Sequence, residues 1–194
     1  MIYIKKLLFL LLIITLIPCR IIKTSNNLPL LVNKDHPLPK EYKPKNLILV
    51  PSFYTVRDTY LDLECFHAFQ KLKEESTYPY LIYSGYRSYE YQEKIYTGDP
   101  YQAKPGESEH QTGLAIDITI DGIGLNKALG DTIYGIWLED NCHKFGFIIR
   151  YPKNKEKITG YLYEPWHIRY VGSDIACQIK QNNLTLEEYI NLNK

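Results

Sequence analysis

The sequence predicts an α+β domain in which a small antiparallel sheet is flanked by helices. Apolar residues recur at helical spacing over residues 57–75. In residues 115–120, in contrast, isoleucine occupies every second position, as expected for a strand with one face toward the core. The other expected elements are short helices and strands joined by turns, and this mixture is typical of helices packed against an antiparallel sheet.

The length and composition indicate one folded domain. The chain has 194 residues, of which 45% are hydrophobic and 23% are charged. Such a chain is long enough to bury one sizeable core, and its composition excludes a disordered or fibrous protein. The net charge is +1, whereas a protein that binds nucleic acid normally carries a basic excess. We therefore expect no nucleic-acid partner, and we expect a monomer.

Residues 1–24 are predicted to be a signal peptide or an N-terminal membrane anchor. Lys5 and Lys6 precede an apolar run from Leu7 to Ile17. This run is shorter than the roughly 20 residues that span a bilayer, and it has the order of charge and apolar core found in signal peptides. We therefore expect an extracytoplasmic protein, either secreted or held at the cell envelope by a membrane tether.

The rest of the chain divides into an extended lead-in over residues 25–51 and a domain over residues 52–194. Asp58, Ser88 and Thr185 are expected helix caps, and Thr185 forms a capping box with Glu188. Asp131 or Thr132 is expected to begin a helix. The expected elements are, in order, a helix over 57–75, a strand over 80–84, a helix over 88–96, a loop over 97–107, a strand over 115–120, a helix ending near Gly146, a strand over 147–151, a strand over 166–171, a helix capped at Ser173, and a last short helix.

Two segments contain residue types that could form a catalytic metal site. One runs from Glu107 to Asp117, and the other is Glu164-Pro165-Trp166-His167. A catalytic zinc takes three protein ligands and leaves one position for water, and a nearby carboxylate accepts the proton of that water. Asp117 lies on the strand face opposite the isoleucines. A buried unpaired acid there would cost several kcal/mol, so a metal or cation partner is the natural explanation.

The spacing of the other candidates is compatible with such a site. His110 precedes a turn containing Gly113, which can fold it back toward Asp117. His167 begins a different strand, and Pro165 holds Glu164 at a fixed offset from it. The spacing alone also allows hydrogen-bonded structural histidines. That interpretation is the one we give to the other three histidines, His36, His67 and His143.

The residues and spacing of these motifs resemble those of a known family. Ser108-x-His110-x6-Asp117 followed by Glu164-x-x-His167 is similar to the zinc D-alanyl-D-alanine carboxypeptidases of the VanY type. Their superfamily also includes the lysostaphin-type endopeptidases and the hedgehog signalling domain. The resemblance extends from about Leu31 to the C-terminal helix. Further similar segments are Leu31-Val32-Asn33-Lys34, Pro37-Leu38-Pro39, Ser84-Gly85-Tyr86-Arg87-Ser88 with Gln92, residues 144–152, and residues 164–170.

This resemblance implies a hedgehog and D-Ala-D-Ala carboxypeptidase-like fold and a role for each site residue. The implied Zn²⁺ ligands are His110, Asp117 and His167, and Glu164 is the implied general base. Arg87 would bind a carboxylate of the substrate. The residues implied to help it are Gln92, Ser108 and Tyr151. The stretch between Tyr96 and Pro105 is shorter than in many relatives, and this difference affects substrate preference more than chemistry.

The expected function is removal of the C-terminal D-alanine from the peptidoglycan stem peptide by a zinc D,D-carboxypeptidase. Three alternatives stay open: an L,D-carboxypeptidase that trims the tetrapeptide stem, a cell-wall endopeptidase, and a non-catalytic zinc-stabilised binding module. Arg87 could also be a structural ion-pair partner of Glu90 or Glu93. An endopeptidase would not need Arg87, and a binding module would not need Glu164.

Overall fold

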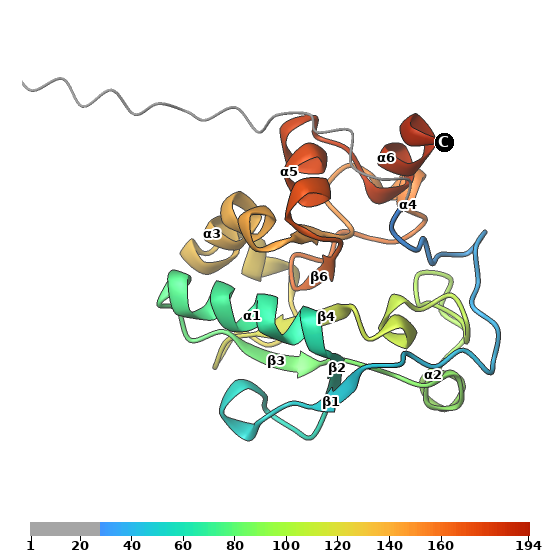
Figure 1. Ribbon diagram of the computed structural model, residues 1–194, viewed down its shortest axis with the longest axis horizontal. Helices are drawn as coiled ribbons and strands as arrows, with labels where there is room; N and C mark the ends of the chain where they lie inside the picture. The colour runs from blue at the N-terminus through green and yellow to red at the C-terminus, as the bar shows by residue number, and fades with distance from the viewer. Residues whose placement is uncertain (1–27) are drawn as a thin grey trace, which may run out of the picture.

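The computed structural model describes residues 28–194. The predicted signal peptide or anchor lies outside these residues. Within them, no helix combines the length and the apolar character needed to cross a membrane. The chain folds as the α+β class that the sequence predicts, with small antiparallel sheets and surrounding helices (Figure 1).

The strands of the described residues form two separate sheets. They are β1 (Leu47–Leu49), β2 (Tyr60–Asp62), β3 (Leu81–Ser84), β4 (Ala115–Thr119), β5 (Phe147–Ile149) and β6 (His167–Tyr170). The larger sheet has the order β3-β4-β6-β5, and each neighbouring pair is antiparallel. β1 pairs with β2 in the smaller sheet, so part of the predicted lead-in is a strand.

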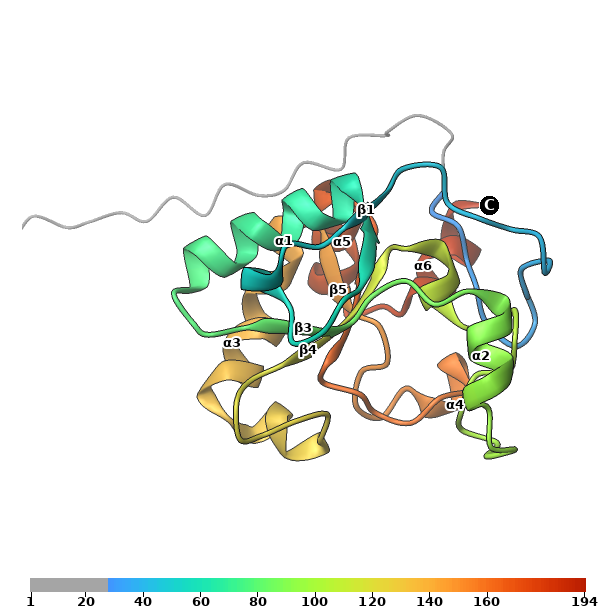
Figure 2. The ribbon, with the colours of Figure 1, turned by 90° about the horizontal axis from the view of Figure 1, so that it is seen from below.

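In residues 28–194, six α-helices surround the sheets. They are α1 (Leu63–Ser76), α2 (Tyr89–Ile95), α3 (Ile133–Asn141), α4 (Glu156–Thr159), α5 (Ser173–Gln181) and α6 (Leu186–Asn193). The described part of the chain also contains four 3₁₀ turns, namely η1 (Ser52–Tyr54), η2 (Glu109–Thr112), η3 (Lys127–Asp131) and η4 (Cys142–Phe145). In both views α1 and α3 lie at one end of the molecule, and α2 and α4 lie at the other (Figures 1 and 2).

The helix predicted over residues 57–75 begins later than expected. Residues 60–62 are strand β2, and α1 starts at Leu63 with Asp62, not Asp58, as its side-chain cap. Leu61 fits the helical apolar pattern, yet it is buried on the strand because β2 leads directly into α1. The caps predicted at Ser88 and Thr185, including the capping box with Glu188, are confirmed.

The other predicted elements agree with the structure apart from their ends. Thr132 caps α3, and Gly146 ends the following turn with a left-handed backbone at φ 84°. The helix expected to be capped at Ser173 starts there, but Gly172 occupies its cap position and no side chain caps it. Pattern reading therefore finds these helices but does not fix every terminal residue.

The sheet separates the core from the functional face. Ile116 and Ile118 on β4 pack into the main hydrophobic cluster with residues of α1 and α3, as the alternation predicts. Cys65 and Cys142 are buried in that same cluster. Because successive strand side chains point to opposite faces, Asp117 must face away from this core.

Candidate active site

The sheet register brings two of the predicted ligands together. Asp117 on β4 is the direct cross-strand partner of His167 on β6, and Ser84 on β3 pairs with Asp117 from the other side. Cβ atoms of directly opposed residues lie about 4.5–5.5 Å apart. Antiparallel pairing therefore places the aspartate and the imidazole on one face of the sheet without any help from loops.

His110 reaches the same face from the 3₁₀ turn η2. The turn ends at Gly113, whose φ of 72° is in the left-handed region. A Cβ at Gly113 would lie 2.8 Å from a terminal methyl group of Leu47, which would have to move, so the left-handed backbone is the stronger reason for glycine here. The carbonyl of His110 accepts hydrogen bonds from the amides of both Gly113 and Arg87, which ties η2 to the segment that carries Arg87.

The three side chains converge on one point. Nε2 of His110 lies 3.2 Å from Oδ2 of Asp117, and Nδ1 of His167 lies 3.1 Å from Oδ1 of the same carboxylate. One donor atom from each residue can be chosen so that all lie within 4.8 Å of one another. All three residues are buried. The structure therefore assembles the ligand set that the resemblance implies.

The hydrogen bonds of His110 leave one nitrogen available. Its Nδ1 lies 2.6 Å from the carbonyl oxygen of Gly85. A carbonyl can only accept, so Nδ1 carries the proton and Nε2 presents its lone pair to the cluster. Nε2 is buried and has no hydrogen-bond partner among the described residues. Burial and the nearby Arg87 guanidinium lower the pKa of His110 to about 4, which keeps the imidazole neutral.

The charges of the cluster fit a divalent metal. Burial alone would raise the pKa of Asp117, but the two imidazoles outweigh it and hold that pKa well below its usual value. Burial opposes charge on His167, but hydrogen bonding to Asp117 raises its pKa to about 9, so a metal that binds at Nδ1 would displace a proton from the imidazole. A carboxylate between two imidazole nitrogens is a donor set used by zinc, and also by iron. These residues therefore fit the metal that the resemblance implies.

Glu164 lies beside the cluster without joining it. Its Oε2 is 3.6 Å from Nδ1 of His167. The carbonyl of Glu164 accepts the amide of His167 at 3.1 Å, so Pro165 occupies the second position of a turn that fixes their offset. Burial raises the pKa of Glu164 to about 7. A carboxylate with that pKa can accept and return a proton near neutral pH.

A cavity of about 210 Å³ opens beside the cluster, and all of the predicted substrate-binding residues line it. Arg87 forms no ion pair within residues 28–194, and its Nε has no hydrogen-bond partner there. The alternative pairing with Glu90 or Glu93 is thus not seen. Ser108 and Tyr151 are buried in the cavity wall, and the Tyr151 ring centroid lies 4.9 Å from that of His167.

Gln92 presents an acceptor rather than a donor to the cavity. Its side-chain amide group donates to the carbonyl of Ala103 at 2.7 Å. Its Oε1 is buried and has no hydrogen-bond partner among the described residues. A free amide oxygen can accept an N–H group, but it cannot donate to a carboxylate.

Sequence reasoning gave no role to a buried charge network beneath the site. Glu109, Arg150 and Arg169 are each at most 1% exposed. Nε of Arg150 donates to Oε1 of Glu109 at 2.7 Å, and Nη1 of Arg169 lies 2.9 Å from the same oxygen. Burial alone would raise the pKa of Glu109, but these two guanidiniums hold it well below its usual value. The one sequence feature that could have pointed to Glu109 was its position next to His110.

Comparison with known proteins agrees with this geometry. Residues 58–173 match the VanY family of D-alanyl-D-alanine carboxypeptidases. The matched span is more than half of the chain, and it contains every predicted site residue. The chain belongs to the VanY family. The predicted resemblance is therefore confirmed.

Two curated relatives show how much of the chain is shared. A putative carboxypeptidase YodJ of Bacillus subtilis is 44% identical over 188 residues, which cover 87% of this chain and 68% of that protein. A D-alanyl-D-alanine carboxypeptidase of Enterococcus faecalis is 37% identical over 188 residues, covering 85% of this chain and 66% of that protein. The chain thus spans about two thirds of the length of these VanY-family relatives.

Solved structures of related proteins share the fold. The LdcB LD-carboxypeptidase is 44% identical with a TM-score of 0.77, over 82% of this chain and 84% of that one. A point mutant of the vancomycin resistance D,D-pentapeptidase VanY from the VanB-type resistance cassette, in complex with Zn(II), is 35% identical with a TM-score of 0.70. That match covers 84% of this chain and 98% of the mutant. The VanY-family fold therefore carries both D,D and L,D activities in the proteins similar to this one.

Proposed function

We propose that this protein is a zinc-dependent D-alanyl-D-alanine carboxypeptidase that removes the C-terminal D-alanine from peptidoglycan stem peptides outside the cytoplasm. One observation carries the proposal. The His110, Asp117 and His167 cluster, the adjacent Glu164 and the unpaired Arg87 border a single cavity. A metal centre, a proton acceptor and a carboxylate-binding group are the three parts that such a hydrolysis needs.

Each residue has a role that its surroundings support. Zinc, when bound by the cluster, would acidify a water molecule and polarise the scissile carbonyl. Glu164, with its pKa of about 7, takes a proton from the attacking water and returns it to the leaving amine. The planar guanidinium of Arg87 matches a terminal carboxylate with two parallel hydrogen bonds. Gln92 accepts an N–H group of the peptide through its free Oε1.

The proposed carboxylate-binding role of Arg87 favours an exopeptidase over an endopeptidase. An internal peptide bond presents no free carboxylate near the cleavage point. A guanidinium that borders the cavity without an internal partner therefore favours cleavage at the end of a chain. The presence of Glu164 beside the cluster likewise favours an enzyme over a zinc-stabilised binding module, since binding alone needs no proton acceptor.

A second candidate is an L,D-carboxypeptidase that acts on the tetrapeptide stem. It is favoured by the 44% identity and the TM-score of 0.77 to the LdcB LD-carboxypeptidase. Both activities use a terminal carboxylate and the same metal cluster. They differ in the configuration of the residue that precedes the bond, and the cavity wall around that residue must make the distinction.

Digestion of defined stem peptides tests the proposal. The zinc-loaded protein is incubated with a pentapeptide stem that ends in D-Ala-D-Ala and, separately, with the tetrapeptide stem. Release of D-alanine from the pentapeptide with little release from the tetrapeptide is expected. The reverse preference would establish the L,D activity. A cross-linked pair of stems is the third substrate: its cleavage without release of terminal D-alanine would indicate an endopeptidase, and no hydrolysis of any of the three substrates would indicate a binding module.

A further inference from the structure

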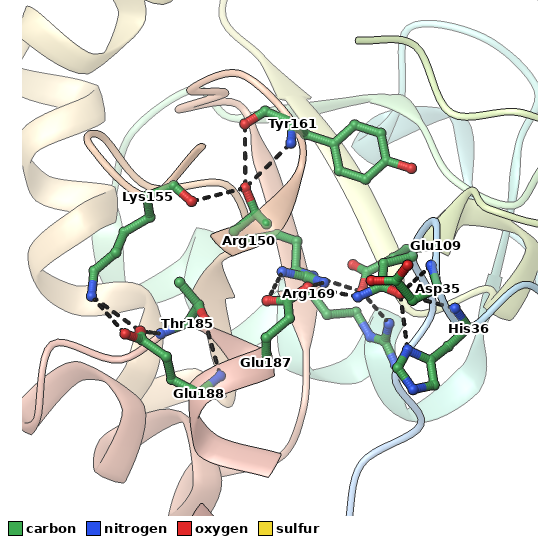
Figure 3. A network of polar contacts seen from close by, with 12 residues as sticks. Asp35, His36, Glu109, Arg150, Lys155, Tyr161, Arg169, Thr185, Glu187 and Glu188 are labelled. Carbon is green, nitrogen blue, oxygen red and sulfur yellow. Dashed lines mark hydrogen bonds and ion pairs between the residues drawn. The ribbon is translucent and has the colours of Figure 1, made fainter. Parts of the chain in front are cut away.

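A buried chain of charges leads from the C-terminal helix toward the metal cluster. Glu187, in the first turn of α6, accepts two hydrogen bonds from Arg150 at 2.9 and 2.6 Å. Nε of the same guanidinium donates to Glu109 at 2.7 Å. Figure 3 shows Arg150 between these two carboxylates. Because the guanidinium is planar and fully buried, it fixes the position of both partners.

Glu109 ends this chain beside a metal ligand. Its Oε1 is occupied by the two arginines, whereas its Oε2 has no hydrogen-bond partner among the described residues. That oxygen lies 3.7 Å from Nε2 of His167, which is also buried and without a partner there. An unpartnered acceptor and an unpartnered imidazole nitrogen therefore face each other.

The orientation of His167 determines what its second nitrogen needs. Its Nδ1 is directed at Asp117 and so belongs to the ligand cluster. A neutral imidazole that offers Nδ1 to a metal carries its proton on Nε2. A carboxylate that accepts this N–H fixes the ring orientation and makes the ligand more basic. The separation of 3.7 Å between Nε2 of His167 and Oε2 of Glu109 is within ion-pair range but longer than a hydrogen bond.

We propose that Glu109 is a positioning residue for His167 and that Arg150 and Glu187 hold Glu109 in place, so that α6 is part of the metal centre. The inference rests on the proposed function, because it requires His167 to bind a metal. A purely stabilising role is the alternative, in which these ion pairs join α6 to the sheet without any effect on the metal.

The coupling extends beyond the residues that match the family. Glu187 lies outside residues 58–173, and so does Asn33, whose side chain donates to Glu187 at 3.1 Å. The segment that follows residue 28, drawn in blue, passes beside α6 in both views (Figures 1 and 2). Both ends of the described chain therefore meet at the carboxylate that anchors Arg150.

Zinc affinity measured by competition with a chromophoric chelator tests the proposal. Glu109→Gln keeps the shape of the side chain but removes its charge, and we expect zinc affinity to fall about 10- to 100-fold. Glu187→Gln should weaken it by a smaller factor. Lys155→Gln is the matched control. Lys155 forms an ion pair at 3.0 Å with Glu188, the neighbour of Glu187 on α6. This pair is partly exposed and lies outside the chain of charges. This control should keep wild-type affinity.

Two further readouts separate positioning from stability. The midpoint of thermal unfolding is measured on the same metal-free samples, and Co²⁺ replaces zinc for visible absorption spectra. A positioning role shifts the Co²⁺ bands of Glu109→Gln, whereas a purely stabilising role lowers the midpoint and leaves the bands unchanged. Wild-type affinity and an unshifted spectrum in folded Glu109→Gln would overturn the inference and leave the proposed function standing.

The remaining outcomes are also decisive. Should Glu109→Gln fail to fold, Glu187→Gln decides, since it leaves Glu109 and His167 intact. Unchanged zinc affinity in Glu187→Gln then overturns the coupling through α6, and reduced affinity supports it. A wild-type protein that binds no zinc would overturn the proposed function together with this inference.

Discussion

Asp117 on β4 lies directly opposite His167 on β6, so a single register of the sheet fixes two of the three residues of the candidate metal cluster. A slip of one residue would turn every side chain of the strand to the other face. Asp117 would then enter the isoleucine core, and the cluster would be lost. The register that buries Ile116 and Ile118 is therefore the register that builds the site.

Removal of the metal should abolish hydrolysis, and added zinc should restore it. The cluster supplies two imidazoles and a carboxylate, and none of these groups alone provides a strong nucleophile at neutral pH. Zinc should also raise the midpoint of thermal unfolding, because a ligand at 100 times its Kd stabilises the folded state by about 2.7 kcal/mol. Hydrolysis that persists in chelator, with no metal detected by elemental analysis, would contradict the metal assignment.

Replacing Arg87 should weaken turnover of substrates that have a free terminal carboxylate. Loss of one partner of a charged hydrogen-bonded pair costs roughly 2–5 kcal/mol, so kcat/KM should fall accordingly in Arg87→Ala. Arg87→Lys should also be impaired, since an ammonium cannot reproduce the planar two-point contact. The measurement is steady-state kinetics on the pentapeptide stem.

An amidated substrate provides the control for Arg87. Wild-type protein acting on the amidated pentapeptide should be as slow as Arg87→Ala acting on the free acid. Because both changes remove the same contact, combining them should add little. Full wild-type activity on the amide would show that Arg87 does not bind the terminal carboxylate.

The three converging residues could be singled out from the sequence because they lie in short, distinctive motifs. Asp117 stood out as an acid in an isoleucine strand, and the offset between Glu164 and His167 is set locally by Pro165. The pairing of Asp117 with His167 could not be predicted, since register depends on contacts between strands that are distant from each other in the chain.

Two short strands and a buried ion-pair network were not predicted from the sequence, each for a different physical reason. β1 and β2 have three residues each, too few to show a strand period, and Leu61 also fits the helical pattern of α1. Arg150 and Arg169 were not predicted to be buried, because arginine is almost never fully buried unless it is paired. Their partner Glu109 is distant in sequence, so the pairing becomes visible only in the folded protein.

Gly85→Ala should destabilise the protein and weaken zinc binding. A Cβ at this position would lie very close to the backbone oxygen of Tyr60, and backbone cannot move aside easily. Overpacking of this kind costs typically about 1–3 kcal/mol. The carbonyl of Gly85 also accepts the Nδ1 proton of His110, so its displacement should misorient that ligand. Chemical denaturation and chelator competition measure the two effects.

Gly98→Ala is the matched control for Gly85. Gly98 has a φ of 90°, but a Cβ there meets nothing within 4 Å. Backbone strain alone should cost about 1–2 kcal/mol of stability and leave zinc affinity unchanged. Equal zinc affinity in the Gly85 and Gly98 variants would show that the Gly85 carbonyl does not orient His110.

Glu164→Gln should separate catalysis from metal binding. Glu164 lies 3.6 Å from Nδ1 of His167, on the cavity side of the cluster, and it is not one of the three converging ligands. Its amide analogue keeps the size of the side chain but cannot accept a proton from water. We expect kcat to fall about 10²- to 10⁴-fold, as is typical for loss of a general base, with zinc affinity close to that of the wild type.

His167→Ala should instead lose both activity and zinc. If Glu164→Gln kept wild-type turnover, another group would have to accept the proton, whereas a loss of zinc as large as that of His167→Ala would make Glu164 a ligand.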